Sequence, residues 1–229
     1  RRVLFRSRAG TAVRRLAIET ATAACSVALV VDGRQRTRRE AGTRVHARVL
    51  VPWIRELLAE SGIGFAALDD VAVDRGPGGF TSLRLGLGVA QGIALAHDLP
   101  VRPVSSLAAL AHAARRAGDR RMLAVLDARM AEVYAGWFGM DRDAPVAGGA
   151  EWLGAPAALP LRFEAPFRAV GNGFSIHREI LVVRLGIDAD AVDAEAEPTA
   201  AAVAALADGV APVAAHALEP TYLRDRVTG

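Results

Sequence analysis

The stretch from residue 71 to residue 95 constrains the fold of this chain more than any other. It reads VAVDRGPGGFTSLRLGLGVAQGIAL, which is a short β-branched run, a break and a long apolar segment. The residues of the break are Gly76, Pro77, Gly78 and Gly79. β-Branched runs are typical of buried strands, and glycine and proline interrupt a regular backbone. The stretch therefore predicts a buried strand, a turn and a helix, with Thr81 or Ser82 as the N-cap of that helix.

The predicted helix has almost no polar face. Arg84 and Gln91 are its only strongly polar side chains between residues 83 and 96. A surface helix normally carries a polar face, and each glycine lowers helix propensity by about 1 kcal/mol. Gly88 and Gly92 are four residues apart and so share one face, where small residues let another helix approach closely. Such a helix is either covered within its own fold or closed over by a partner, and we favour the partner.

The rest of the first half predicts alternating strands and helices. Two apolar runs between Arg15 and Val31 are separated by a polar cluster that begins at Glu19, and the Asp32–Gly33 turn leads into a polar strand over residues 34–40. Apolar residues at helical spacing predict a helix over residues 46–60. A strand over residues 99–104 and a helix through Ala114, capped by Ser105 or Ser106, complete the order β-β-β-α-β-α-β-α.

The second half opens in a similar way. Strands are expected over residues 121–126 and 132–138, which repeats the hairpin at the start of the chain. Residues 141–166, rich in Ala, Gly and Pro, show no clear pattern. A strand that ends in a turn is expected over residues 168–173, and an Ala-rich helix over residues 199–208. The class is α/β with two similar units.

The ends of the chain bear on its partners and its compartment. Residues 1–8 hold four arginines, and RRVLFRS back-translates to a common sequencing adapter, so we interpret residues 1–12 as a non-native or disordered leader. Without residues 1–8, the net charge of +3 becomes slightly negative, which gives little support for nucleic-acid binding by the chain alone. We expect the first unit over residues 13–116 and the second over 117–229, and leave open whether the C-terminal segment returns to the first. No apolar run approaches ~20 residues, which predicts a cytoplasmic protein without a membrane span.

The residues alone yield no catalytic constellation and predict neither a metal nor a cofactor. The histidines are scattered, and His46 is followed four residues later by Leu50 rather than by a second ligand. Cys25 sits in an apolar run, as a buried structural thiol does. Glu19 could serve an ATP site of the actin-like type, but no glycine beside it would let a phosphate approach.

Two motifs stay open between a ligand and a structural role. The loop of Gly76, Pro77, Gly78 and Gly79 could present backbone N–H groups to a phosphate at the following helix, or could simply let strand and helix pack closely. Asp127 and Arg129, in LDARMAEVY, follow a strand, where functional residues often sit. An ion pair or hydrogen bond that closes the turn explains them equally well.

Six segments together resemble the TsaB (YeaZ) family. They are LAIETATAACSVALVVDG, HARVLVPWIRELLAESGI, RGPGGFTSLRLGLGVAQGIALAHDLP, VSSLAALA, LDARMAEVYAG and EPTYLRD. The resemblance covers residues 15–227 and is weakest over residues 141–166. It implies the two-lobed actin-like ATPase (ribonuclease H-like) fold, with a mixed sheet and flanking helices in each lobe.

The resemblance also implies a function. Members of this family are non-catalytic partner subunits in the transfer of a threonylcarbamoyl group to N6 of adenosine 37, in tRNAs reading ANN codons. They bind and activate a catalytic paralogue, TsaD, together with the ATPase TsaE, reach tRNA only through that complex, and form homodimers when alone. The competing hypothesis is an independent ATPase or metallopeptidase-like enzyme of the same fold.

The family's partner surface maps onto the two helices of the first unit. The residues expected there are His46, Val49, Leu50, Trp53, Thr81, Arg84, Leu87, Gly88 and Gln91. From this expectation, Leu87→Glu abolishes partner binding and leaves the monomer folded.

Overall fold

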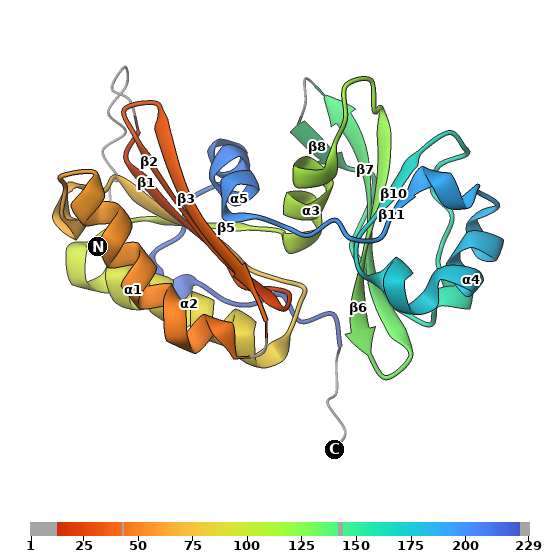
Figure 1. Ribbon diagram of the computed structural model, residues 1–229, viewed down its shortest axis with the longest axis horizontal. Helices are drawn as coiled ribbons and strands as arrows, with labels where there is room; N and C mark the ends of the chain where they lie inside the picture. The colour runs from red at the N-terminus through yellow and green to blue at the C-terminus, as the bar shows by residue number, and fades with distance from the viewer. Residues whose placement is uncertain (1–12, 43, 142–143, 225–229) are drawn as a thin grey trace. The chain divides into compact units, whose positions relative to one another are not determined.

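The computed structural model describes residues 13–42, 44–141 and 144–224, and the chain divides into two units (Figure 1). Unit 1 comprises residues up to 75, residues 79–104 and residues 199–220. Unit 2 comprises residues 76–78, 105–198 and the C-terminal residues from 221. The expected leader, residues 1–12, lies outside the described residues.

Unit 1 is built on a five-stranded sheet in the order β3-β2-β1-β4-β5. The strands are β1 (Arg15–Glu19), β2 (Ala24–Val31), β3 (Arg34–Ala41), β4 (Asp70–Asp74) and β5 (Val101–Val104). The first three pair as antiparallel hairpins, and β4 and β5 add in parallel to β1. Parallel pairing needs crossover helices, which is why β1 and β4 are buried along their whole length.

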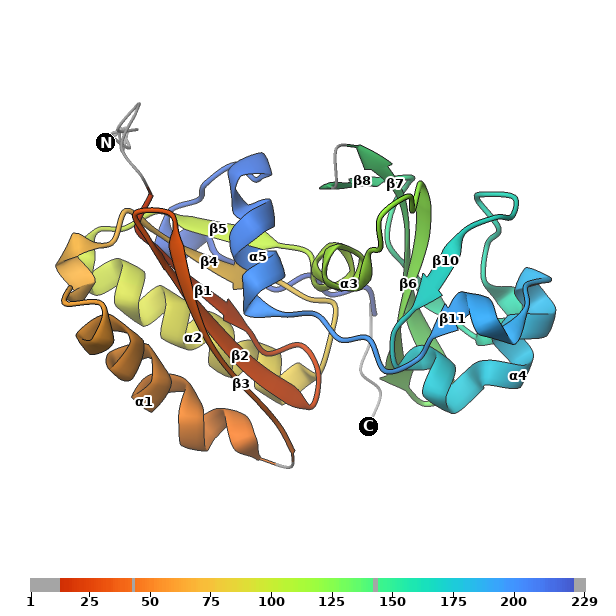
Figure 2. The same ribbon diagram turned by 45° about the horizontal axis from the view of Figure 1, so that its top comes forward.

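Helices cover both faces of this sheet. Helices α1 (Val45–Glu60) and α2 (Phe80–His97) lie together on one face, and α5 (Ala200–Leu206) covers the other (Figures 1 and 2). The α1 and α2 face carries large apolar side chains, among them Leu16 and Ile18 of β1, which form the core of the unit. Burial of such side chains contributes about 1.5–3 kcal/mol each and dominates the stability of the unit.

The face under α5 is different, because it combines alanines with buried charges. Asp70 accepts hydrogen bonds from Arg15 (Nε–Oδ1, 2.7 Å) and from Arg102 (Nε–Oδ2, 2.7 Å), and Arg15 also pairs with Asp208 (2.8 Å). Burial acts to lower the pKa of Arg15, but its hydrogen bonds to Asp70 and Asp208 outweigh that effect and raise it. This network attaches residues 199–210 to β1, β4 and β5, so the C-terminal segment returns to unit 1.

Unit 2 repeats the topology of unit 1. Its strands are β6 (Arg121–Arg129), β7 (Glu132–Asp141), β8 (Ala144–Ala147), β9 (Trp152–Gly154), β10 (Arg168–Val170) and β11 (Val192–Asp193). The order β8-β7-β6-β10-β11, antiparallel through β8, β7 and β6 and parallel through β10 and β11, matches that of unit 1 strand for strand; β9 adds to β7. The predicted repeat of the opening hairpin is confirmed.

Two helices cover the sheet of unit 2 on opposite faces. Helix α3 (Ser106–Ala114) packs on alternate residues of β6 that include Met122, and α4 (Gly173–Leu185) packs on the intervening residues that include Leu123. Helix α3 contacts β6, β7 and β8 and therefore groups with unit 2. The expected boundary at residue 116 thus differs from the observed one at residue 104, because the partner of a helix is decided by packing and not by chain order.

Most elements of the first half match their predicted ranges within a few residues. Ser105 caps α3 by accepting a hydrogen bond from the backbone N–H of Ala108 (3.1 Å), as expected. Helix α4 was not predicted, and β8 and β9 lie in the stretch where the pattern was unclear. Short 3₁₀ helices occur at Phe65–Ala67, Pro156–Ala158, Ala189–Ala191, Ala207–Gly209 and Ala215–Ala217.

The buried charges under α5 give a test of this arrangement. Asp70→Ala leaves two guanidinium groups without their shared carboxylate, so we expect it to lower the free energy of unfolding by about 3–5 kcal/mol in urea titrations. Glu60→Ala, which breaks a pair with the more exposed Arg38, should cost no more than about 1 kcal/mol. Equal losses in the two variants would contradict this account.

Candidate partner-binding site

Helix α2 starts at the glycine loop without a side-chain cap. Its N-cap is Gly79, and the prediction that Thr81 or Ser82 caps the helix is wrong. The backbone N–H of Gly79 donates to the carbonyl of Ala21 (2.7 Å), and the Ser82 hydroxyl donates back to the carbonyl of Gly79 (3.2 Å). The loop is therefore tied to the β1–β2 turn, and this tie fixes where α2 begins.

A close contact sets the rotation of α2 about its axis. A Cβ on Gly86 would lie 2.3 Å from the Thr20 hydroxyl oxygen, so a side chain at this position would force the helix off the sheet. Thr20 is itself held by Asp74, which accepts a hydrogen bond from the Thr20 backbone N–H (3.0 Å). With Gly86 facing inward, Leu83, Leu87, Ala90 and Ala94 also face the core.

The opposite side of α2 is exposed along its whole length. The exposed residues recur at helical spacing as Thr81, Arg84, Gly88, Gly92 and Leu95. We call this set the α2 stripe. Leu95 is 64% exposed, and the Arg84 guanidinium lies 3.5 Å from the centre of the Phe80 ring. The helix is therefore not covered on all sides within its own unit.

The two glycines of the α2 stripe have no packing role inside the unit. A Cβ at Gly88 or at Gly92 would meet nothing within 4 Å. Each glycine costs about 1 kcal/mol of helix stability relative to alanine, and no contact within the unit offsets that cost. Small residues at this spacing are suited to the close approach of a second helix.

Burial separates the residues expected at the partner surface. Thr81, Arg84 and Gly88 belong to the α2 stripe, and Trp53 of α1 is half-buried. The remaining residues are either buried or hydrogen-bonded within unit 1. The buried ones are His46, Val49, Leu50 and Leu87, and the hydrogen-bonded one is Gln91. A helical apolar stripe identifies a face that must be covered, and here the sheet of unit 1 covers it.

Three of these residues, Leu87, His46 and Gln91, make specific contacts within unit 1. Leu87 is 4% exposed and packs in the core, so the expectation that Leu87→Glu leaves the monomer folded is wrong: the variant would bury a carboxylate. His46 Nε2 lies 3.0 Å from the carbonyl oxygen of Ala24. Gln91 donates its amide N–H groups to the carbonyls of Ala215 (3.2 Å) and Leu218 (3.0 Å), which ties the returning C-terminal segment to α2.

The strand ends beneath α2 carry two fully buried carboxylates. Glu19 ends β1 and accepts a hydrogen bond from the backbone N–H of Ala21 (2.8 Å), while Asp74 ends β4 and accepts one from Thr20. These carboxylates accept hydrogen bonds from the loop N–H groups that would otherwise be available to an anion, and their negative charge repels a phosphate. Asp74 was missed in the sequence because one acid after a strand has no distinguishing spacing.

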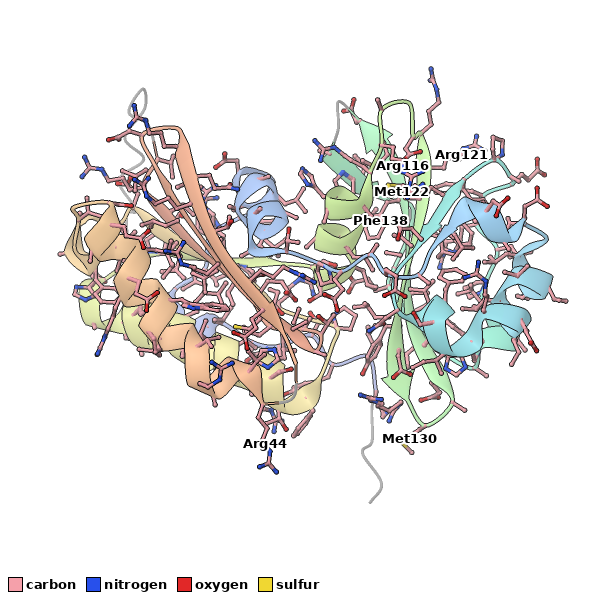
Figure 3. All side chains as sticks on the ribbon, viewed as in Figure 1. Arg44, Arg116, Arg121, Met122, Met130 and Phe138 are labelled. Carbon is pink, nitrogen blue, oxygen red and sulfur yellow. The ribbon has the colours of Figure 1, made fainter. Side chains whose placement is uncertain are left out.

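The two motifs left open by the sequence both make local structural contacts. Gly76 accepts a hydrogen bond from the backbone N–H of Ser106 (2.9 Å). Asp127 accepts one from the backbone N–H of Arg129 (3.1 Å) and lies 3.3 Å from its guanidinium, so the pair closes the β6–β7 hairpin, whose tip carries Met130 (Figure 3). These contacts fit the structural alternative for each motif, and ligand binding there stays a hypothesis.

Within the described residues, no three side chains among His, Cys, Asp and Glu are grouped so that they could hold a metal ion. Over the same residues, no helix has both the length and the apolar character that a membrane crossing needs.

Comparison with known proteins gives the family. A family model described as "TsaD: tRNA N6-adenosine threonylcarbamoyltransferase" matches residues 39–224. Two solved structures from Pseudomonas aeruginosa are 37% identical to this chain and are covered over 100% of their length. One is described as similar to peptidase YEAZ (TM-score 0.85, 93% of this chain) and the other as YeaZ (TM-score 0.83, 92% of this chain). The chain belongs to the TsaB (YeaZ) family. It is also part of the wider family that the TsaD model describes, and its two mixed sheets with flanking helices have the expected two-lobed actin-like fold.

Curated relatives support the same family. The protein named "tRNA threonylcarbamoyladenosine biosynthesis protein TsaB" is 47% identical over 120 residues in Haemophilus influenzae, which is 52% of this chain and 51% of the relative. The protein of that name in Escherichia coli is 45% identical over 132 residues, 57% of this chain and 56% of the relative. The chain spans about half the length of these curated relatives in the alignments.

The two classes of glycine on α2 predict opposite effects on stability. Gly88→Ala removes backbone entropy from the unfolded chain and meets open space, so it should raise the free energy of unfolding by about 0.5–1 kcal/mol. Gly86→Ala forces a Cβ against Thr20 and should lower it by about 1–3 kcal/mol. Urea unfolding followed by circular dichroism measures both, and a change of the same sign in both variants would refute the assigned rotation of α2.

Cys25 offers a chemical test of the core. Burial, followed by the negative charges of Glu19, Asp74 and Glu40, raises the pKa of the Cys25 thiol to about 12. The thiolate is the reactive form, so iodoacetamide at pH 8 should modify the native chain far more slowly than the chain in urea. The raised pKa also stabilises the fold below about pH 9, and this contribution is lost as the pH rises towards 12. Equal alkylation rates with and without urea would contradict the burial.

Proposed function

We propose that this TsaB-family chain is a non-catalytic partner subunit in tRNA threonylcarbamoyladenosine formation. In this proposal it binds and activates the catalytic paralogue TsaD, together with the ATPase TsaE. The complex transfers the threonylcarbamoyl group to N6 of adenosine 37 in tRNAs reading ANN codons. The relatives named as TsaB biosynthesis proteins support the pathway.

The α2 stripe is the observation that carries the proposal. It runs along a helix whose other side is fixed to the sheet, and its two glycines cost helix stability without any compensating contact inside the unit. Two exposed glycines beside the exposed Leu95 on one helix face suit the close approach of a partner helix. A helix that packs against Gly88 and Gly92 would approach closely enough to offset that cost.

Shared ancestry supports TsaD as the partner. The TsaD model matches this chain over most of its length, so the paralogue is expected to present a helix pair in the place of α1 and α2. Two similar faces can then pack against each other in a nearly symmetric way. The same argument predicts that the chain forms a homodimer when TsaD is absent. In this proposal the complex acts in the cytoplasm, where tRNA is modified.

The buried carboxylates support a role without catalysis by this chain. In unit 1, Glu19 and Asp74 accept hydrogen bonds from backbone N–H groups of the turn after β1. A phosphate bound at this turn would need the same N–H groups. We therefore assign the chemistry to the paralogue. The competing hypothesis, an independent ATPase or metallopeptidase-like enzyme, requires turnover by the purified chain alone.

Charge on the α2 stripe tests the proposal. Leu95→Glu places a carboxylate on the exposed stripe, so the monomer should keep its circular dichroism spectrum and its melting temperature to within a few degrees. Co-elution with TsaD in gel filtration should disappear, and tRNA modification in the reconstituted system should fall at least tenfold.

Val183→Glu is the matched control, because Val183 is an equally apolar residue that is 83% exposed on α4 of unit 2. It should leave co-elution and modification unchanged. Retained co-elution of the Leu95→Glu variant, or ATP or peptide hydrolysis by the wild-type chain without TsaD, would refute the proposal.

A further inference from the structure

A hollow of about 580 Å³ lies at the end of unit 2 where β6 and β10 begin. Its charged lining residues are Asp119, Arg120, Arg121 and Arg168, and the others are Gly118, Pro166, Phe167 and Ala191. Pockets of about 300–1,000 Å³ hold ligands larger than a single ion. The hollow lies entirely within unit 2 and is separate from the α2 stripe, which belongs to unit 1.

Arg168 carries a donor that the protein leaves unused. Its Nη2 donates to Asp193 (2.8 Å), but its Nε is buried and no described residue accepts a hydrogen bond from it. Oδ2 of Asp119 lies 4.0 Å from that Nε. A buried N–H without an acceptor is unfavourable, so Arg168, which lines the hollow, keeps hydrogen-bonding capacity that the described residues do not meet.

Two arginines at the rim are exposed. Arg121 donates from Nη1 to the carbonyl of Glu164 (3.2 Å), and its guanidinium carbon lies 5.6 Å from the centre of the Phe163 ring. Arg120 is exposed beside it. Arg116 lies at the same end of the unit as Arg121 (Figure 3). An arginine next to an aromatic ring is a common setting for nucleic-acid phosphates and bases.

The acidic groups around the hollow pair with Arg168 and not with the two arginines at the rim. Asp193 is paired with Arg168 (2.8 Å), and Asp119, which lines the hollow, lies 4.0 Å from Nε of the same arginine. Asp188 and Asp190 are exposed on the segment that leads to Ala191, another lining residue. Arg120 and Arg121 form no ion pair with any of these four carboxylates, so the rim near β6 keeps its positive charge.

We propose that this hollow binds the phosphodiester backbone of the RNA substrate, with Arg120 and Arg121 at the rim and Arg168 in the lining. The inference rests on the proposed function, because that function brings an RNA to the complex. The volume of the hollow and the spread of the arginines around it fit one nucleotide of an RNA chain better than a single phosphate ion. This chain would then position the tRNA as well as the paralogue.

The experiment uses the complex of this chain with TsaD and an unmodified tRNA transcript in fluorescence anisotropy. The double variant Arg120→Glu/Arg121→Glu should weaken tRNA binding at least tenfold. It should also lower the slope of log K against log salt concentration by about two, one for each phosphate that the variant no longer neutralises. Co-elution with TsaD should not change. Arg168→Gln, which removes a guanidinium from the lining, should weaken binding as well.

The matched control is Arg34→Glu/Arg36→Glu, which makes the same change in net charge at exposed positions of β3 in unit 1. It should have less than a threefold effect on tRNA binding. Equal losses in the two double variants, or none in either, would overturn the inference while leaving the proposed function intact. Displacement of the tRNA by millimolar inorganic phosphate would indicate a small-anion site and would also overturn it. Failure of the wild-type complex to form would refute both the proposed function and this inference.

Discussion

The contact between Gly86 and Thr20 determines which side of α2 is exposed on unit 1. Because Gly86 has no side chain, α2 settles directly on the turn that follows β1, and Asp74 holds that turn in place. This close approach fixes which side of α2 faces the sheet. The residues on its far side, from Thr81 to Leu95, are thereby fixed as surface, and a rigid surface loses little entropy when a partner binds.

Unit 1 uses the two faces of one sheet in different ways. Large apolar side chains face α1 and α2, whereas alanines and the carboxylate of Asp70 face α5. The small residues let α5 approach, and the charges attach a segment that is more than a hundred residues away in the chain. Gln91 extends the attachment by holding Ala215 and Leu218 to α2. Hydrogen bonds between distant segments thus stiffen the helix that carries the α2 stripe.

The elements that the sequence predicted are those with a strong local signal. The hairpin at Asp32–Gly33, the apolar stripe of α1 and the cap at Ser105 each follow from a few neighbouring residues, and all are present. Helix α4 lacks such a signal, because it starts at a glycine and has no side-chain cap. Strands β8 and β9 are short pieces whose only support is their pairing with β7.

The sequence by itself determined the α/β class, the repeated opening of the two units and the presence of an unusually apolar, glycine-rich helix, α2. These follow from periodicity and residue type, which act over a few residues. The tertiary structure decided which side of α2 is exposed, so Leu87 is core and Leu95 is surface. It also decided that α3 belongs to unit 2, that residues 199–220 complete unit 1, and that Arg168 lines a hollow with Arg120 and Arg121. The physical reason is the same in each case: burial and ion pairing join residues that are far apart in the chain, and no local pattern records the partner.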